Sequence, residues 1–213
     1  DFRWDKILYC GGFTTARPGI VAVDERAKFP RMRPFYRHAE HDGVWYAGCI
    51  MHGFDYRHSS GGFIHGFRYL VRAQVRYFAH LNSKKRWPRQ RRSYDRTRAA
   101  ALERVRESSG LYQMQSELCD VFVLTADDSD DPVMVHLEEI PRRWVAHVLD
   151  GDKSVVARPY WTLSFEYGDT TPWTFELLFS KKRTQSQVPN FLHPVLRRWT
   201  KSGALEETIR LPE

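Results

Sequence analysis

The most regular pattern of apolar positions lies in the first half of the chain. Residues 44–47 (VWYA) form a short apolar run that Gly48 ends, which predicts a buried strand. After a loop, apolar side chains recur at helical spacing and predict a long helix with Ser59 or Ser60 as its N-cap. The stripe consists of Phe63, Phe67, Leu70 (or Val71), Gln74 and Phe78. The opposite face carries Arg68, Arg72 and Arg76.

Two glycines, Gly61 and Gly62, stand in the first turn of this predicted helix, where glycine lowers helix stability. Small residues at a helix start allow another group to approach the backbone closely. The amides there, together with the helix dipole, form a site for an anion or a carbonyl oxygen. On these residues alone, an ordinary capped helix is the favoured interpretation.

Alternating patterns dominate the second half of the chain. Residues 118–125, 133–137 and 160–167 are rich in β-branched and aromatic side chains and predict strands. In residues 160–167 the aromatic positions share one face, so Thr162 and Ser164 are expected to face solvent. We expect residues 173–179 to form the hairpin partner of 160–167.

Three further elements complete the prediction. Residues 6–10 predict a strand that ends in Gly11 and Gly12, and residues 97–108 a helix that Gly110 ends. Residues 190–198 predict a short helix packed on the strands. We therefore expect three segments: 1–82, a basic linker and helix at 83–110, and a strand-rich α+β domain at 111–213.

Composition narrows the classes of protein that the chain can represent. Among its 213 residues, 42% are hydrophobic and 14% aromatic, which is enough for a packed core. No apolar run is long enough to span a bilayer, and we expect no membrane span. The three cysteines lie far apart without a CxxC motif, so neither a disulfide framework nor a zinc ribbon is supported.

The formal charge of +7 is concentrated in residues 83–98 (SKKRWPRQRRSYDRTR). We interpret this run as a solvated linker or exposed insertion. A nucleic-acid patch is the sharper alternative, because lysine and arginine bind phosphates and Trp87 and Tyr94 can stack on bases. No recognisable nucleic-acid-binding fold surrounds the run, so a nucleic-acid partner is disfavoured.

Other candidate chemistry is set aside. Five histidines lie close together in sequence, but the spacing of His38 and His41 is not that of a metal-binding helix, Pro34 and Gly43 indicate a loop there, and no metal is predicted. They are His38, His41, His52, His58 and His65. No GxSxG, Walker loop or paired-carboxylate motif indicates hydrolysis or phosphoryl transfer. The catalytic residues therefore stay unassigned.

A resemblance gives these patterns a function. Residues 46–69 (YAGCIMHGFDYRHSSGGFIHGFRY) resemble the closing segment of the FAD domain in the FAD-dependent oxidoreductase domain-containing protein 2 family, the endoplasmic-reticulum flavoproteins associated with degradation. Residues 9–13, 110–114 and 190–196 are also similar to this family. More distantly, the chain resembles flavin-containing monooxygenases and pyridine-nucleotide oxidoreductases.

The resemblance implies an α/β fold, in which a strand, glycine loop and helix close a Rossmann-like FAD domain before the smaller strand-rich domain. It implies FAD as cofactor and NAD(P)H as co-substrate, with Ser60–Gly62 amides facing the flavin. Cys49 stands where many relatives place an aspartate that holds the ribityl chain, so backbone amides would serve there. The cofactor-binding positions implied are Gly11, Gly12, Gly48, Cys49, Asp55, Ser59, Ser60, Gly61 and Gly62.

Neither GxGxxG motif of a two-dinucleotide flavoprotein is present, so we expect this portion alone neither to hold FAD well nor to turn over. The resemblance implies residence in the endoplasmic-reticulum lumen and quality-control protein partners; without a retrieval signal in these residues, a cytoplasmic location is the alternative. Two other functions stay open. Residues 84–98 could bind RNA or an acidic partner. Alternatively, residues 111–213 could bind a partner protein in a chain whose flavin site is degenerate and no longer holds the cofactor.

Overall fold

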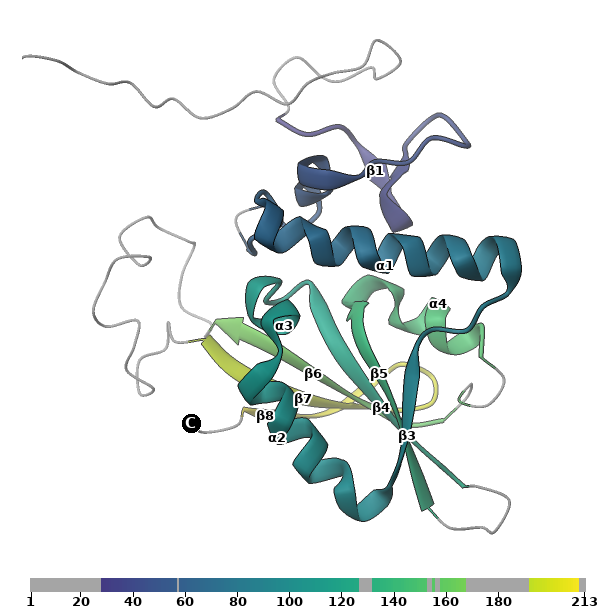
Figure 1. Ribbon diagram of the computed structural model, residues 1–213, viewed down its shortest axis with the longest axis vertical. Helices are drawn as coiled ribbons and strands as arrows, with labels where there is room; N and C mark the ends of the chain where they lie inside the picture. The colour runs from purple at the N-terminus through teal and green to yellow at the C-terminus, as the bar shows by residue number, and fades with distance from the viewer. Residues whose placement is uncertain are drawn as a thin grey trace, which may run out of the picture.

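The computed structural model describes residues 28–56, 58–126, 132–152, 155, 158–167 and 192–210. These residues form a mixed helix and sheet structure, as the fold prediction required (Figure 1). The predicted strand at 6–10, its two glycines and the segment 173–179 lie outside the described residues. The division into three segments stays a prediction.

A six-stranded antiparallel sheet, in the order β3-β5-β4-β6-β7-β8, forms the centre of the described structure. Its strands are β3 (Arg89–Ser93), β4 (Leu118–Ala126), β5 (Pro132–Pro141), β6 (Tyr160–Tyr167), β7 (Leu192–Trp199) and β8 (Leu205–Arg210). The sequence predictions for β4, β5 and β6 are confirmed. β5 is longer than predicted because it pairs with β3 on one edge and β4 on the other.

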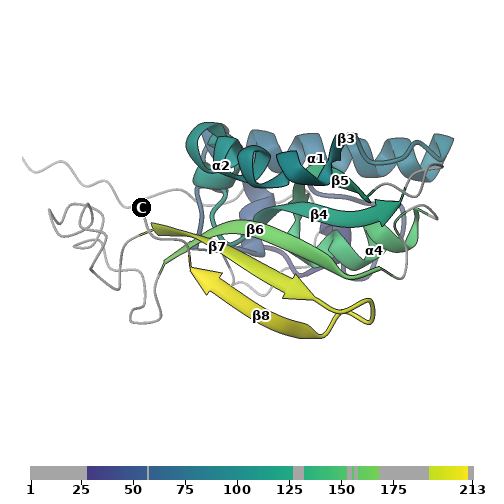
Figure 2. The same cartoon turned by 90° about the horizontal axis from the view of Figure 1, so that it is seen from below.

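The helices complete the layers. The longest, α1 (Ile64–Ser83), crosses the sheet near one end of its strands, and α2 (Thr97–Glu107) lies on the same side (Figures 1 and 2). Two short helices, α3 (Ser109–Gln113) and α4 (Val145–Asp150), connect strands at that end, and 3-10 turns η3 (Tyr94–Arg96) and η4 (Arg142–Trp144) precede α2 and α4. The predicted helix at 97–108 is confirmed, but Gly110 lies inside α3 instead of ending it.

The N-terminal part of the described chain packs against α1. It contains a two-stranded ribbon of β1 (Met32–Arg33) and β2 (Arg37–His38), joined by η1 (Pro34–Tyr36), and the 3-10 turn η2 (Gly48–Gly53). Residues 44–47 are not the predicted strand. They are extended but make one isolated bridge, between Trp45 and Arg37. Two backbone bonds flank this bridge, so the apolar run pairs locally with the ribbon.

The C-terminal prediction was also wrong, because most of residues 190–198 belong to β7. Its eight residues pair one-to-one with β6, from Tyr167 opposite Leu192 to Tyr160 opposite Trp199. Cross-strand pairing therefore decides the conformation of a short apolar segment whose own pattern is ambiguous. The same packing covers Thr162 and Ser164, which are buried and not solvent-facing.

The basic run is likewise not a solvated linker over its whole length. Residues 89–93 form β3, an edge strand of the sheet. Charged side chains on an edge strand discourage pairing with another chain, and the opposite edge, β8, also carries charges and is exposed. Arg86 and Arg89 pair with the buried Asp152, so part of the charge has a partner within the fold.

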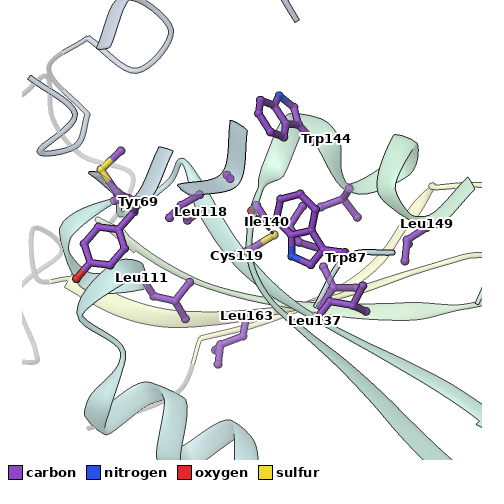
Figure 3. Packing of buried hydrophobic residues seen from close by; sticks show 14 of the residues in the cluster. Tyr69, Trp87, Leu111, Leu118, Cys119, Leu137, Ile140, Trp144, Leu149 and Leu163 are labelled. Carbon is purple, nitrogen blue, oxygen red and sulfur yellow. Dashed lines mark hydrogen bonds between the residues drawn. The ribbon is translucent and has the colours of Figure 1, made fainter. Parts of the chain in front are cut away.

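The main core lies between α1, the short helices and the sheet (Figure 3). Leu118 and Cys119 of β4 and Ile140 of β5 are fully buried, and Trp87 belongs to the same buried cluster. The buried face of α1 is rotated relative to the predicted stripe. Leu70 and Gln74 are buried as expected, but Phe63 is 64% exposed. The buried residues of α1 are Gly66, Tyr69, Leu70, Ala73, Gln74 and Tyr77.

Candidate functional site

The candidate site is the loop Gly48–Gly62, which includes η2 and leads into α1. Gly48 opens it with a φ of +79°, a conformation that glycine adopts without strain, and a side chain at this position would meet no atom within 4 Å. The neighbouring Cys49 is exposed. The backbone at Gly48 is therefore open to the approach of another group, as its predicted role requires. The side chain of Cys49 is also accessible.

A buried hydrogen-bonded pair, His52 and Asp55, lies where η2 ends. His52 Nδ1 and Asp55 Oδ1 are 3.0 Å apart, and the two side chains are 11% and 4% exposed. The second carboxylate oxygen, Oδ2, is buried without a hydrogen-bond partner. The pair lies beneath Gly61, where an added Cβ would stand 2.8 Å from Asp55 Oδ2 and 2.9 Å from His52 Nδ1. Only glycine fits at position 61 without displacing the pair.

The helix begins three or four residues later than predicted, because its N-cap is Phe63 and not Ser59 or Ser60. α1 starts at Ile64, with Phe63 as an N-cap that provides no side-chain hydrogen bond. Gly61 and Gly62 lie in the turn before it, so they do not weaken the helix. Gly66 lies in its first turn, and an added Cβ there would stand 2.0 Å from the carbonyl oxygen of Ser60. The absence of a side chain at position 66 thus lets the turn fold directly onto the helix.

The amides predicted to face flavin are partly used within the chain. Ser60 N donates to the carbonyl oxygen of Gln113 at 3.0 Å, and Gly61 N donates to Ser59 Oγ at 3.1 Å. Within the described residues, no hydrogen bond is made by the amide of Gly62 or by those of Ile64 and His65 in the first turn of α1. The amides available to a ligand are therefore those of Gly62, Ile64 and His65, which lie closer to the helix than the predicted Ser60–Gly62.

A second buried acid lies behind the loop. Tyr36 donates from its hydroxyl to Glu117 Oε1 at 3.3 Å, and both side chains are buried. Burial, reinforced by the charge of Asp55, raises the pKa of Glu117 to about 7. Burial, followed by the charge of Glu117, also raises the pKa of the Tyr36 hydroxyl. Asp55 thus acts electrostatically on both partners as well as pairing with His52.

A charged network anchors the helices to the sheet. The fully buried Asp120 accepts hydrogen bonds from Arg104 of α2 (2.5 Å), from the amide of Glu139 (2.9 Å) and from His136 (3.0 Å). Burial alone would raise the pKa of Asp120, but the hydrogen bonds from His136 and Arg104, together with the charge of Arg104, outweigh it and hold the pKa below its usual value. Arg72 of α1 pairs with Glu139 in the same network. Because its charges are paired, we assign this network to stability.

The structure thus brings together part of the predicted site. Asp55, Ser59, Ser60, Gly61 and Gly62 form one compact turn, whereas Gly48 and Cys49 lie at the start of the loop. Gly11 and Gly12 lie outside the described residues. Asp55 is enclosed beneath the turn, so its position suits it to support the backbone. The assignment of all these residues to flavin stays a prediction.

Two residues that interact with the predicted site, His52 and Glu117, were not among the site residues predicted from the sequence. The i, i+3 spacing of His52 and Asp55 is a signal that could have indicated their pairing. Glu117 is 81 positions from Tyr36, and only the fold reveals that contact. Within the described residues, no group of three or more His, Cys, Asp or Glu side chains is placed to hold a metal ion. No helix in the same part of the chain is long and apolar enough to cross a membrane.

Comparison with known proteins supports the family resemblance. The chain is 32% identical over 205 residues to the mouse protein named FAD-dependent oxidoreductase domain-containing protein 2, and 30% identical over 204 residues to the zebrafish protein of that name. Each match covers 91% of this chain but 30% and 29%, respectively, of the relative. The chain thus spans less than a third of the length of these relatives. No protein-family model matches it, and no solved structure matches it significantly.

Proposed function

Because the chain is homologous to a segment of the FAD-dependent oxidoreductase domain-containing protein 2 proteins, we propose that it contributes to an FAD site through the loop Gly48–Gly62 and the start of α1. The observation that carries the proposal is the turn at Ser60–Gly62, whose tight packing leaves unpaired amides at the start of a 20-residue helix. Such amides, aligned with the helix dipole, suit the carbonyl and phosphate oxygens of a dinucleotide.

The residues present fit this role in two ways. The amides of Gly62, Ile64 and His65 would donate hydrogen bonds to acceptor oxygens. The buried pair of His52 and Asp55 would support the turn from beneath, because both side chains pack directly against Gly61. When bound, FAD supplies the chemistry of hydride transfer, and the protein supplies its position and electrostatic surroundings.

We further propose that the complete enzyme takes its reducing equivalents from NAD(P)H. This proposal rests on the similarity of the family to pyridine-nucleotide oxidoreductases. Anaerobic addition of NADPH or NADH to the flavin-loaded protein should bleach its visible absorbance. An absorbance unchanged by either nucleotide would refute this part of the proposal.

The cellular setting is also a proposal. By the same resemblance, the protein acts in the endoplasmic-reticulum lumen with quality-control partners. Immunofluorescence of the endogenous protein should coincide with a lumenal marker. A diffuse cytoplasmic signal would instead favour the alternative location.

The flavin proposal is tested by a matched pair of glycine substitutions in the full-length protein. A Cβ at Gly62 would lie 3.2 Å from His52, and a Cβ at Gly151, at the end of α4, would lie 3.1 Å from His80. Gly62→Val should lower the FAD released per protein several-fold, whereas Gly151→Val should not. Equal flavin content in both variants and the wild type, each folded by circular dichroism, would place the cofactor elsewhere.

A further inference from the structure

A hollow of about 540 Å³ opens on the side of the sheet where β4 begins. Its walls come from the start of β4, from η4 and α4, from β6 and from the turn between β7 and β8. A concave site of this size, lined by aromatic side chains and a few polar groups, is typical of small-molecule binding. Neither the flavin proposal nor the family resemblance gives this hollow a role.

One wall of the hollow is aromatic. The rings of Tyr160 and Trp199 line it and are stacked with centroids 6.1 Å apart and planes 13° apart. The indole nitrogen of Trp199 donates to Thr162 Oγ1 at 2.9 Å. Because the polar atom of the indole is satisfied within the protein, the surface that remains for a ligand is the apolar ring. Such a wall suits a flat, apolar group.

Another wall is cationic, because it carries Arg142 and Arg143 of η4. Arg142 donates from Nη1 to Glu166 Oε1 at 2.9 Å and to the carbonyl oxygen of Ser116 at 3.3 Å. Arg143 donates from Nη2 to the carbonyl oxygen of Phe54 at 2.9 Å. A guanidinium has five N–H donors, so each arginine keeps donors for an anion. Both side chains are held in place by the bonds already made.

Glu117 also lines the hollow and is buried, with 5% of its surface exposed. Its pKa of about 7 means that it is largely protonated below neutral pH and ionised above it. When protonated, a carboxyl donates a hydrogen bond; when ionised, it repels an anion. The titratable and charged groups that act on it are Asp55, Arg143, Tyr36 and Arg142. The charge of Glu117 also acts on the buried Cys119, which lies two residues further along the chain in β4.

We propose that this hollow binds a small aromatic carboxylate, with the carboxylate on Arg142 and Arg143, the ring against Tyr160 and Trp199, and Glu117 as hydrogen-bond donor. A planar guanidinium can donate two parallel hydrogen bonds to the two oxygens of a carboxylate. The aromatic wall favours an anion that carries a ring over an inorganic anion. Binding requires the protonated form of Glu117, so each bound anion should be accompanied by proton uptake near neutral pH.

The test uses benzoate as the probe and isothermal titration calorimetry on the purified full-length protein. If only the protein with protonated Glu117 binds, the fraction competent to bind falls from about nine-tenths near pH 6 to about one-tenth near pH 8, so the apparent affinity should fall about tenfold. Titrations near pH 7 in two buffers of different ionisation enthalpy should show the proton uptake. Benzyl alcohol, which keeps the ring without the charge, should bind much more weakly.

Two variants identify the site. Arg143→Gln should weaken benzoate binding, whereas Arg98→Gln, an exposed arginine that lines a separate groove beside α2, should not. Glu117→Gln should keep binding but abolish its pH dependence, because an amide donates at every pH. Benzoate binding that is absent, equal in the Arg143→Gln variant, or matched by inorganic phosphate would overturn the proposal. Since none of these measurements uses flavin content, the result is independent of the cofactor proposal.

Discussion

Replacing Glu117 by glutamine should stabilise the protein, although it removes a buried hydrogen-bonded side chain. Burial and the charge of Asp55 raise the pKa of Glu117 from 4.5 to about 7. The folded protein therefore holds this proton more tightly than the unfolded chain does. The stability that the protonated carboxyl contributes is fully present below about pH 4.5 and is lost as the pH rises through about 7.

The magnitude follows from the same shift. At about 1.4 kcal/mol per tenfold change in proton affinity, moving the pKa from 4.5 to about 7 corresponds to about 3 kcal/mol. Glutamine keeps the shape and polarity of the protonated acid. The Glu117→Gln variant should thus match the wild type near pH 4.5 and exceed it by up to about 3 kcal/mol near pH 8.

Urea denaturation followed by tryptophan fluorescence, at a series of pH values, measures this difference in the free energy of unfolding. The matched control is Glu166→Gln, because burial tends to raise the pKa of Glu166 but the hydrogen bond from Arg197 and the charge of Arg142 hold it below its usual value. Its contribution is present above the unfolded pKa and is lost as the pH falls. Glu166→Gln should therefore destabilise at neutral pH, with a difference that shrinks in acid. A Glu117→Gln difference that is constant with pH would refute the reasoning.

Three further predictions concern other parts of the fold. Asp120→Asn should lower the free energy of unfolding, measured in urea, by about 3 kcal/mol, because it leaves Arg104 and His136 without the carboxylate that they contact. A loss below about 1 kcal/mol would contradict a stabilising role for the Asp120 network. Gly66→Ala should lower the melting temperature measured by circular dichroism, since its Cβ would collide with the carbonyl oxygen of Ser60; an unchanged value would mean that the turn is free to move. Cys49→Ser should remove one fast-reacting thiol in a titration with Ellman's reagent, whereas Cys119→Ser should remove none. Burial encloses the Cys119 thiol and raises its pKa. A Cys119→Ser variant with one fewer fast-reacting thiol would contradict this burial.

The strands of the second half were predictable because their pattern and their environment agree. In β6, the predicted bounds 160–167 are the observed ones, and its β-branched and aromatic side chains do pack on a sheet. The prediction that failed in the same region concerns Thr162 and Ser164. Alternation indicates which residues share a face, but it does not reveal that the second face is covered as well.

The failures at residues 44–47 and 190–198 have a common cause. Each segment is short and apolar, so its conformation depends on the partner that the fold provides. The first meets only the small ribbon at Arg37, whereas most of the second gains the whole length of β6. The start of α1 was misplaced for a local reason. Ser59 does accept a backbone amide hydrogen bond, but it caps the glycine turn at Gly61 and not the helix.

The site itself was only half visible in the sequence. The glycines and serines of the loop could be identified from their order along the chain, because a turn is a local structure. The acid behind them could not, since Tyr36 and Glu117 are 81 positions apart and only the tertiary fold brings them together. Perturbed acids of this kind arise from burial and neighbouring charges, which no motif records.

Asp55 connects the two proposed sites. Through His52 it supports the glycine turn where we place the flavin, and through its charge it raises the pKa of Glu117 in the hollow. Arg143 makes a second connection, because it lines the hollow and also donates to the carbonyl oxygen of Phe54 in the flavin loop. A movement of Asp55 would therefore change the charge near Glu117, and a movement of Phe54 would change the orientation of an arginine that lines the hollow. Since coupling between two binding sites is reciprocal, a flavin at the loop and an anion in the hollow should change each other's binding free energy by the same amount.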